Sequence, residues 1–344
     1  MAGKRYRVAQ WATGHTGMSS LRSIVEHPEL DLVGLRVYAD EKVGRDAGEL
    51  CGLAPTGVVA TRNIDDILAA RPDCVMYMPL LHNESIDDMC RILESGSNIV
   101  TAVVGFAHAD TIDPGIRERI EQACARGGTS LYGTGSCPGF ITEVVPLALL
   151  VMERKLDCLS IVQYADLSNR RSPEFLRTIY GIDPATADLT DGATRSEMAD
   201  GAALRQIAAA MSVPIDNMTA TSSIAVSTKT VEIDVMTIPA GTVGAWRQDI
   251  AGFHKGSPVL EYSRVKYVVR DLEPAWEVQN TGWHVSVRGD VPMEMDLRFG
   301  TENYRDWSPG INANLPVNSI ADVCDARSGI LTTAELPLVP NFSR

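Results

Sequence analysis

The stretch from Arg5 to Gly17, Arg-Tyr-Arg-Val-Ala-Gln-Trp-Ala-Thr-Gly-His-Thr-Gly, decides the fold of this chain. A short apolar run passes directly into a Gly-x-x-Gly turn and then into a helical pattern at residues 18–26. Proteins hold a dinucleotide pyrophosphate in this context, because Gly14 lets the backbone approach the phosphates and Gly17 lets the helix pack on the strand. Ala12 stands where the full Gly-x-Gly-x-x-Gly motif has its first glycine, so an ordinary strand-to-helix turn is the alternative.

The composition is that of a globular protein with more than one domain. The chain has 344 residues, of which 45% are hydrophobic and 22% are charged, so it can bury a sizeable core and two domains are expected. A formal net charge of −13 argues against nucleic acid or an anionic membrane as a partner. We find no signal peptide before the first strand, and the longest apolar run, residues 144–152, is too short for a membrane span.

The cysteines indicate a reducing compartment. Seven are present, with no Cys-x-x-Cys pair and no spacing typical of metal ligands. Several lie in apolar contexts, where a reduced cysteine acts as a small hydrophobic residue. We therefore expect a cytoplasmic protein with no bound metal.

Strand and helix patterns alternate through the first half of the chain. Strands are expected at residues 5–11, 30–38, 58–60, 74–78, 98–104 and 129–132, and helices at 18–26, 64–70, 84–95 and 115–126. This alternation predicts βαβ units, a parallel sheet and an α/β fold, with a Rossmann-type NAD(P)-binding domain over residues 1–150. In such sheets the ligand lies outside the carboxyl ends of the strands. That rule selects residues 14–17, 38–42, 79–82, 101–105 and 133–139 as one rim.

The pattern changes near residue 155. A strand at 156–164, helices at 173–180 and 195–211, and long strands at 221–236, 241–251, 259–269 and 284–298 are expected. Alternating polar and apolar residues predict an open, largely antiparallel sheet with one wet face. We interpret residues 151–310 as a substrate and dimerisation α+β domain. A helix at 314–326 would bring the tail, residues 311–344, back to the first domain.

The end of the second strand bears on the choice between NAD and NADP. An Asp or Glu usually binds the ribose hydroxyls there, about twenty residues past the glycine turn. Asp40 comes two or three positions late, whereas Lys42 and Arg45 could meet a 2′-phosphate. The sequence leaves the choice open and slightly favours NADP.

Two further segments carry a family resemblance. With Lys-Val-Gly-Arg-Asp-Ala-Gly-Glu-Leu at 42–50 and Gly-Thr-Gly-Ser-Cys-Pro-Gly-Phe-Ile-Thr-Glu at 133–143, the chain resembles the 2,4-diaminopentanoate dehydrogenase and native amine dehydrogenase family. These proteins are also described as dihydrodipicolinate reductase-like. The resemblance implies a homodimer that reductively aminates a ketone with a reduced nicotinamide, and it places the Gly-Thr-Gly-x-x-Pro-Gly turn beside the nicotinamide and substrate. The residues expected to contact the cofactor are Ala12, Thr13, Gly14, His15, Thr16, Gly17, Tyr38, Lys42, Pro79, Thr101, Gly135 and Pro138.

One departure from the family concerns proton transfer. The resemblance implies a glutamate just after the strand at 98–102, but residues 101–108 read Thr-Ala-Val-Val-Gly-Phe-Ala-His. Valine cannot act as a general acid or base. His108 is the nearest titratable candidate and Tyr164 is another, with His82 a weaker one; packing is the alternative for each. We assign Glu143 to the dipole of the helix that it begins.

The sequence supports three functional hypotheses. The first is hydride transfer between a nicotinamide and a C=O or C=N carbon of a small, fairly apolar ketone, imine or amine, with the cofactor supplying the chemistry. The second is a ketone or imine reductase that does not use ammonia. The third is a catalytically silent NAD(P)-binding sensor or scaffold. Dihydrodipicolinate reductase itself is excluded, because its His-His-x-x-Lys and Lys-x-x-Ser/Pro-Gly-Thr-Ala segments are absent.

Overall fold

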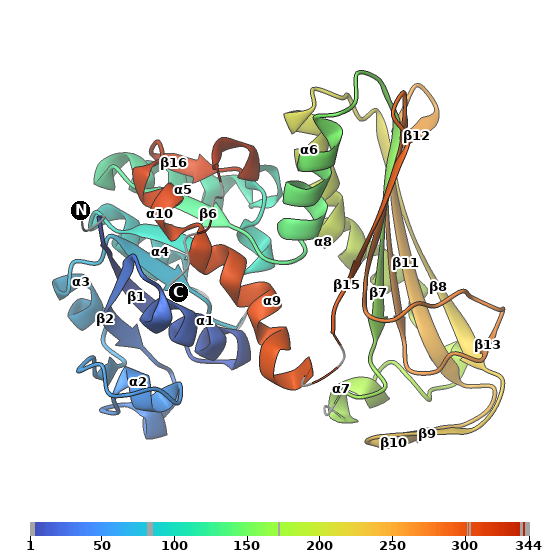
Figure 1. Cartoon of the computed structure of the whole chain (residues 1–344), viewed down its shortest axis with the longest axis horizontal. Coiled ribbons are helices and arrows are strands. Elements are labelled where there is room, and N and C mark those ends of the chain that lie inside the picture. Colours follow the sequence, from blue (N-terminus) through green and yellow to red (C-terminus); the bar gives the residue numbers. More distant parts are fainter. Residues whose placement is uncertain are drawn as a thin grey trace. The chain divides into compact units, whose positions relative to one another are not determined.

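The chain folds into two compact units (Figure 1). The structure is a computed structural model that describes residues 4–80, 85–170, 173–300, 302, 304–337 and 340. The first unit combines Met1–Val144 with Glu302–Arg344, and the second is Val145–Thr301. The expected α/β fold is confirmed, with a parallel sheet in the first unit and a mixed, largely antiparallel sheet in the second.

The first unit is built on a seven-stranded sheet in the order β16-β6-β5-β4-β1-β2-β3. All of its strand pairs are parallel. The strands are β1 (Tyr6–Trp11), β2 (Leu30–Arg36), β3 (Ala60–Thr61), β4 (Cys74–Tyr77), β5 (Asn98–Thr101), β6 (Ser130–Gly133) and β16 (Gly329–Leu331). Their buried Val, Ile and Leu residues suit a sheet that is covered on both faces.

Helices cover both faces of this sheet. They are α1 (His15–Glu26), α2 (Ala47–Leu50), α3 (Ile64–Ala69), α4 (Ile86–Glu94), α5 (Pro114–Gly127), α9 (Tyr304–Asn318) and α10 (Ile320–Asp325), with short turns η1 (Asp40–Lys42), η3 (Val104–Phe106), η4 (Ala109–Thr111), η5 (Phe140–Val144) and η7 (Thr333–Glu335). One core cluster joins the sheet to α3, α4 and α5, and another joins it to α1, α9 and α10. In Figure 1 the red α9 runs beside the blue α1, although the two are far apart in the sequence.

Local sequence signals set the ends of these helices. In α5, the Asp113 carboxylate accepts hydrogen bonds from the amides of Gly115 (2.9 Å) and Ile116 (3.1 Å), and Pro114 takes the first helical position. The helix ends where Gly128 adopts a left-handed φ of 67°. Such caps satisfy amides that the helix itself leaves unbonded, so they direct where each helix begins and stops.

The second unit is built on the sheet β13-β8-β11-β12-β7-β14-β15. Its strands are β7 (Leu156–Asp166), β8 (Asn217–Ser227), β11 (Val243–His254), β12 (Ser257–Tyr267), β13 (Leu272–Glu273), β14 (Gly282–Gly289) and β15 (Met293–Arg298), and β9 (Val231–Ile233) and β10 (Met236–Ile238) form a separate hairpin. The helices are α6 (Val145–Leu150), α7 (Pro173–Arg177) and α8 (Leu189–Ala210), with the short turn η6 (Pro184–Thr186). Within the sheet, β7 and β12 run parallel and the other pairs are antiparallel.

A polar network attaches α8 to one face of this sheet. Gln163 of β7 lies opposite Arg264 of β12, and its Oε1 accepts from Arg264 Nε at 2.8 Å and from the Tyr262 hydroxyl at 3.0 Å. Arg264 also forms an ion pair of 2.7 Å with Asp200 of α8, whose side chain is 1% exposed. A buried charge needs such a partner, so this pair holds the helix in place on the sheet.

Two of the long strands expected in the second unit are interrupted. Residues 284–298 form the hairpin β14–β15, whose turn contains Asp290. The Asp290 carboxylate accepts from the amides of Arg154 (3.1 Å) and Lys155 (2.8 Å) and anchors this turn. The strand expected at 221–236 ends at Ser227, whose hydroxyl donates to the Lys229 carbonyl at 2.6 Å. A local bond of this kind between the Ser227 side chain and the backbone competes with continued strand pairing.

Loss of the Asp200 carboxylate is expected to destabilise the second unit. Asp200→Ala would leave the Arg264 guanidinium buried without its counter-charge, which costs about 3 kcal/mol of unfolding free energy. Urea denaturation would measure the loss. The exposed pair Lys155–Asp157 supplies the control, and Asp157→Ala should change stability little. Equal effects of the two substitutions would contradict a stabilising role for the buried pair.

Candidate functional site

The carboxyl ends of the parallel strands meet at one edge of the first sheet. β1 pairs with β2 on one side and with β4 on the other, so the direction in which the strand order grows reverses between β1 and β4. Ligands of open α/β sheets bind outside the carboxyl ends of the strands at such a reversal. The turn at residues 12–17 follows β1 directly and therefore stands at this point.

The turn at Ala12 has the backbone conformation that the glycine motif requires. Ala12 has a φ of 73°, in the left-handed region that favours glycine. A Cβ atom on Gly17 would lie 2.5 Å from the Ala12 carbonyl oxygen, so α1 starts directly against the turn. The same oxygen accepts from Gln10 Nε2 at 2.9 Å, and the Ser20 hydroxyl donates to Gln10 Oε1 at 2.8 Å. The buried Gln10 side chain thus bonds both the turn and α1.

The start of α1 has the properties of an anion site. Gly14 is the N-cap and has no side chain to bond the first amides, and the first turn of α1 contains no acidic residue. Gly14 and His15 are exposed, Thr16 is half-buried, and a Cβ on Gly14 would have nothing within 4 Å. Free amides and the positive end of the helix dipole favour a phosphate in this open space.

Lys42 adds a positive charge to the same turn. Its ammonium donates to the Thr13 carbonyl oxygen at 2.9 Å and to the Thr13 hydroxyl at 3.1 Å. Asp40, the carboxylate considered for the ribose, is exposed and forms an ion pair with Arg62, and Arg45 is also exposed. The structure therefore brings Lys42 to the glycine turn, while Asp40 is engaged elsewhere.

Sequence reasoning missed Arg36, the last residue of β2. Its guanidinium lies 3.9 Å from the centroid of the Tyr38 ring and 4.9 Å from that of Trp11. Trp11 Nε1 donates to the Tyr38 hydroxyl at 3.0 Å, which fixes the two rings that hold the cation. Nη1 donates to the Val37 carbonyl at 3.2 Å, whereas the buried Nε has no hydrogen-bond partner. A cation thus stands at the strand end where NAD enzymes have a carboxylate.

The ends of β4 and β5 present apolar groups. Pro79 is buried after β4. The Thr101 hydroxyl donates to the Tyr77 carbonyl at 2.6 Å and accepts from the Val103 amide at 3.1 Å, so it holds the backbone. Val104 is 46% exposed in the segment that has no carboxylate. His82 lies outside the described residues.

The turn at residues 133–139 is held by the C-terminal segment. Gly139 has a φ of 127°, and a Cβ there would lie 2.3 Å from the Gly135 carbonyl oxygen. Asn312 of α9 accepts from the Ser136 amide at 3.3 Å and from the Ser136 hydroxyl. Gly135 and Pro138 are both buried. The turn is therefore compact, and Ser136 is bonded to Asn312, which lies 176 residues further along the chain.

Glu143, which the sequence assigns to a helix dipole, is buried instead. It lies in η5 with 2% exposure, and the Thr333 hydroxyl donates to its carboxyl group. The Tyr132 hydroxyl is hydrogen-bonded to Thr333 Oγ1 at 3.0 Å. Burial raises the pKa of Glu143 to about 8. The sequence signal for burial was its place inside the apolar run Phe-Ile-Thr-Glu-Val-Val at 140–145.

The two candidates for proton transfer lie in different surroundings. His108 is buried and caps η4, where its Nδ1 accepts from the Asp110 amide at 3.2 Å. Tyr164 follows Gln163 on β7, so it points to the sheet face opposite α8, and burial raises the pKa of its phenol. The described contacts give His108 a structural role at the start of η4.

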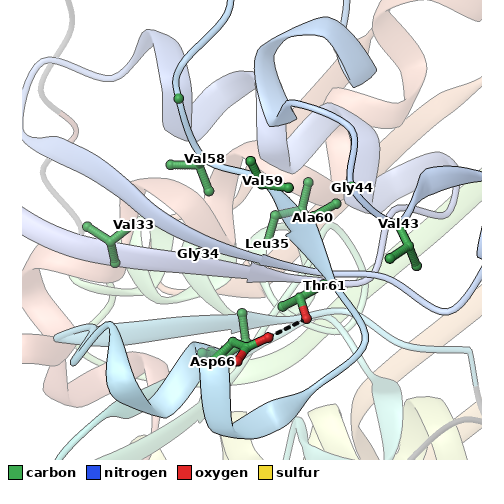
Figure 2. Close-up of a pocket in the computed structure, with 12 residues that line it drawn as sticks. Val33, Gly34, Leu35, Val43, Gly44, Val58, Val59, Ala60, Thr61 and Asp66 are labelled. Atoms are coloured by element: carbon green, nitrogen blue, oxygen red, sulfur yellow. Dashed lines mark hydrogen bonds between the residues drawn. The ribbon is translucent and has the colours of Figure 1, made fainter.

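A pocket lies beside β2 and β3 (Figure 2). Its lining consists of Val33, Gly34, Leu35, Val43, Gly44, Gly57, Val58, Val59, Ala60, Thr61, Asp66 and Ile67. The Asp66 carboxylate accepts from the Thr61 hydroxyl at 2.6 Å, the dashed line of Figure 2. No residue of the turn at 12–17 lines this pocket, so we do not place the nucleotide in it.

Among the described residues there is neither a cluster of metal-ligating side chains nor a membrane-spanning helix. Nowhere in the described parts of the chain do three His, Cys, Asp or Glu side chains gather as a metal ion would need. None of the helices in those parts has the length and apolarity required to cross a membrane.

Comparison with known proteins identifies similar enzymes. Residues 184–343 match the family model described as the 2,4-diaminopentanoate dehydrogenase C-terminal domain. An amine dehydrogenase from Streptomyces virginiae is 29% identical over 349 residues, with 97% of each chain covered. Both matches confirm the resemblance to the 2,4-diaminopentanoate dehydrogenase and amine dehydrogenase family. They also confirm the expected enzyme class, a nicotinamide-dependent oxidoreductase.

Solved structures agree with this fold. An amine dehydrogenase from Mycobacterium smegmatis matches with a TM-score of 0.76 at 16% identity, covering 99% of this chain and 98% of that one. The WlbA dehydrogenase from Bordetella pertussis, solved with NADH and UDP-GlcNAcA, matches with a TM-score of 0.53 at 11% identity, covering 94% and 89%. At these identities the two structures support the fold alone.

The two motif glycines are expected to respond differently to substitution by valine. Gly14→Val should leave folding intact, because the added atoms meet open space, but should weaken nucleotide binding about 100-fold by filling the phosphate position. Gly17→Val should destabilise the fold by about 1–3 kcal/mol, because its Cβ would clash with the Ala12 carbonyl. Thermal unfolding and nucleotide titration of both variants separate the effects. Unchanged nucleotide affinity in a folded Gly14→Val protein would remove the phosphate assignment.

Proposed function

We propose that this chain is an NADPH-preferring oxidoreductase that transfers hydride to or from the C=O or C=N carbon of a small, fairly apolar ketone, imine or amine. The observation that carries the proposal is the open anion site at Gly14, which lies at the strand-order reversal and beside the Lys42 ammonium. The amine dehydrogenases related to this chain support the substrate class. The cofactor supplies hydride, and the protein supplies orientation.

Contacts with the cofactor are proposed along the rim predicted from the sequence. The turn from Ala12 to Gly17 would hold the pyrophosphate, with Tyr38 and Lys42 beside the adenosine half. Pro79, Thr101, Gly135 and Pro138 would border the nicotinamide half. We further propose that the second unit carries substrate binding and dimerisation, in a cytoplasmic homodimer.

The preference for NADPH rests on Arg36. An adenosine 2′-phosphate needs a cation near the end of β2, where NAD enzymes place a carboxylate against the ribose hydroxyls. Arg36 ends that strand, is stacked on Tyr38 and Trp11, and keeps an unbonded Nε. A stacked guanidinium is preorganised for a phosphate, because its planar fork loses little freedom on binding.

Arg36→Ala is expected to reduce the preference for NADPH. A charge-assisted contact contributes about 1.5–3 kcal/mol, so the NADPH dissociation constant should rise about 10- to 100-fold and that of NADH should change little. Lys42→Ala should weaken both nucleotides alike, since its ammonium holds the turn at Thr13. Fluorescence titration measures both, with Arg126→Ala on the exposed surface of α5 as a control. Equal loss of NADH and NADPH in Arg36→Ala would overturn its assigned role.

The end of β5 favours a second candidate, a reductase that does not use ammonia. The family resemblance implies a glutamate there, and this chain has the exposed Val104 in a segment without a carboxylate. No side chain at residues 101–105 could take up or release a proton as ammonia adds to a carbonyl. A preformed imine would need no such addition.

Turnover measurements test the proposed function and its subtype. We expect oxidation of NADPH, followed at 340 nm, when small aliphatic ketones with ammonium or preformed cyclic imines are supplied. The Gly14→Val protein provides the control with weakened cofactor binding. Turnover of imines that is independent of ammonium would select the second candidate. Tight NADPH binding without turnover of any carbonyl, imine or amine would instead leave a nucleotide-binding sensor.

A further inference from the structure

Glu143 connects two segments that are distant in the sequence. Its amide donates to the Gly139 carbonyl at 2.8 Å, so it belongs to the backbone structure that closes the turn at 133–139. Its carboxyl accepts from Thr333, which begins η7 just after β16. Thr333 in turn bonds the Tyr132 hydroxyl at the end of β6. The carboxyl thus lies in a buried chain of hydroxyl groups beneath the turn.

We propose that Glu143 is a positioning residue of the cofactor site, held as a neutral carboxylic acid that ties the turn at 133–139 to Thr333. The inference rests on the proposed function, because it takes this turn as one of the strand-end segments that border the cofactor. Glu143 is itself 2% exposed, so it acts through the turn and does not touch a ligand.

The surroundings of Glu143 favour the neutral form. Among the described contacts, the Thr333 hydroxyl of η7 bonds the Glu143 carboxyl, and Tyr132 of β6 bonds Thr333. Asp322 of α10 acts on Tyr132 and adds a negative charge to this region. Glu335 of η7 is bonded to Arg327. An ionised carboxylate among these groups would pay a large desolvation penalty, so the proton is retained.

The raised pKa sets the direction of the pH dependence. In the unfolded chain a glutamate has a pKa of about 4.3, whereas Glu143 in the folded chain has a pKa of about 8. Its contribution to stability is therefore full below about pH 4.3, falls as the pH rises, and is lost above about pH 8. We expect the ionised form to release the turn. One pH unit above the pKa of Glu143, about a tenth of the protein then remains able to bind NADPH, so the apparent NADPH dissociation constant rises about tenfold.

Glu143→Gln tests the inference, because the amide is neutral at every pH and nearly isosteric. We would measure NADPH dissociation constants from pH 6 to pH 9 and, without cofactor, urea unfolding over the same range. Wild type should lose affinity and stability toward pH 9, while Glu143→Gln should show a nearly flat profile. Glu118→Gln, an exposed position on α5, should behave like wild type. Thr333→Val should move the wild-type profile to higher pH, because the Thr333 hydrogen bond lowers the pKa of Glu143.

Parallel profiles of wild type and Glu143→Gln would overturn the inference. If the stability measured by urea unfolding does not change with pH, and NADPH affinity falls with pH in both proteins, the pH dependence belongs to another group. If wild type binds no NADPH at any pH, the proposal that NADPH is the cofactor is wrong. The proposal that Glu143 positions a cofactor site is then wrong as well. The urea series would then still report whether the carboxyl is held neutral, which distinguishes the two failures.

Discussion

The close approach of α1 to β1 at the Ala12 carbonyl is the constraint on which the first unit depends. It requires a residue without Cβ at Gly17 and a left-handed backbone at Ala12, which costs about 1 kcal/mol for a residue other than glycine. Gln10 offsets part of this cost by bonding the turn. Because α1 begins here, its unbonded amides lie at the strand ends. The packing of α9 on α1 then brings Asn312 to the turn at 133–139.

Much of the fold could be predicted because its signals are local. The six first-half strands and the helices at α1, α3, α4 and α5 follow apolar periodicity and caps, and they were placed within a few residues. The strand β16 was missed, since its three residues show no period and pair only when the tail reaches β6. The hairpin β14–β15 was expected as one strand, because alternation continues across the turn at Asp290.

In the candidate site, too, the residues with local sequence signals could be predicted and those that depend on tertiary contacts could not. The glycine turn and Lys42 could be found because strand, turn and helix are consecutive, and the carboxyl-edge rule locates the remaining segments. The role of Arg36 could not be predicted, because it depends on the pairing of β1 with β2, which places Trp11 beside the guanidinium. Glu143 looks like a helix-start carboxylate in the sequence, and it is buried because the distant Thr333 lies against it. Such tertiary contacts leave little trace in one sequence.

Hydride addition to a ketone and hydride addition to an imine differ in where the proton comes from. Hydride addition to a neutral ketone creates an alkoxide that needs a proton from a nearby acid, whereas addition to a protonated imine yields a neutral amine directly. The end of β5 presents Val104 in place of an acid, and the protonated Glu143 is too buried to reach a ligand. His108 already accepts a backbone hydrogen bond through Nδ1. An apolar strand end therefore suits a substrate that arrives with its proton, which favours a C=N bond over a free carbonyl.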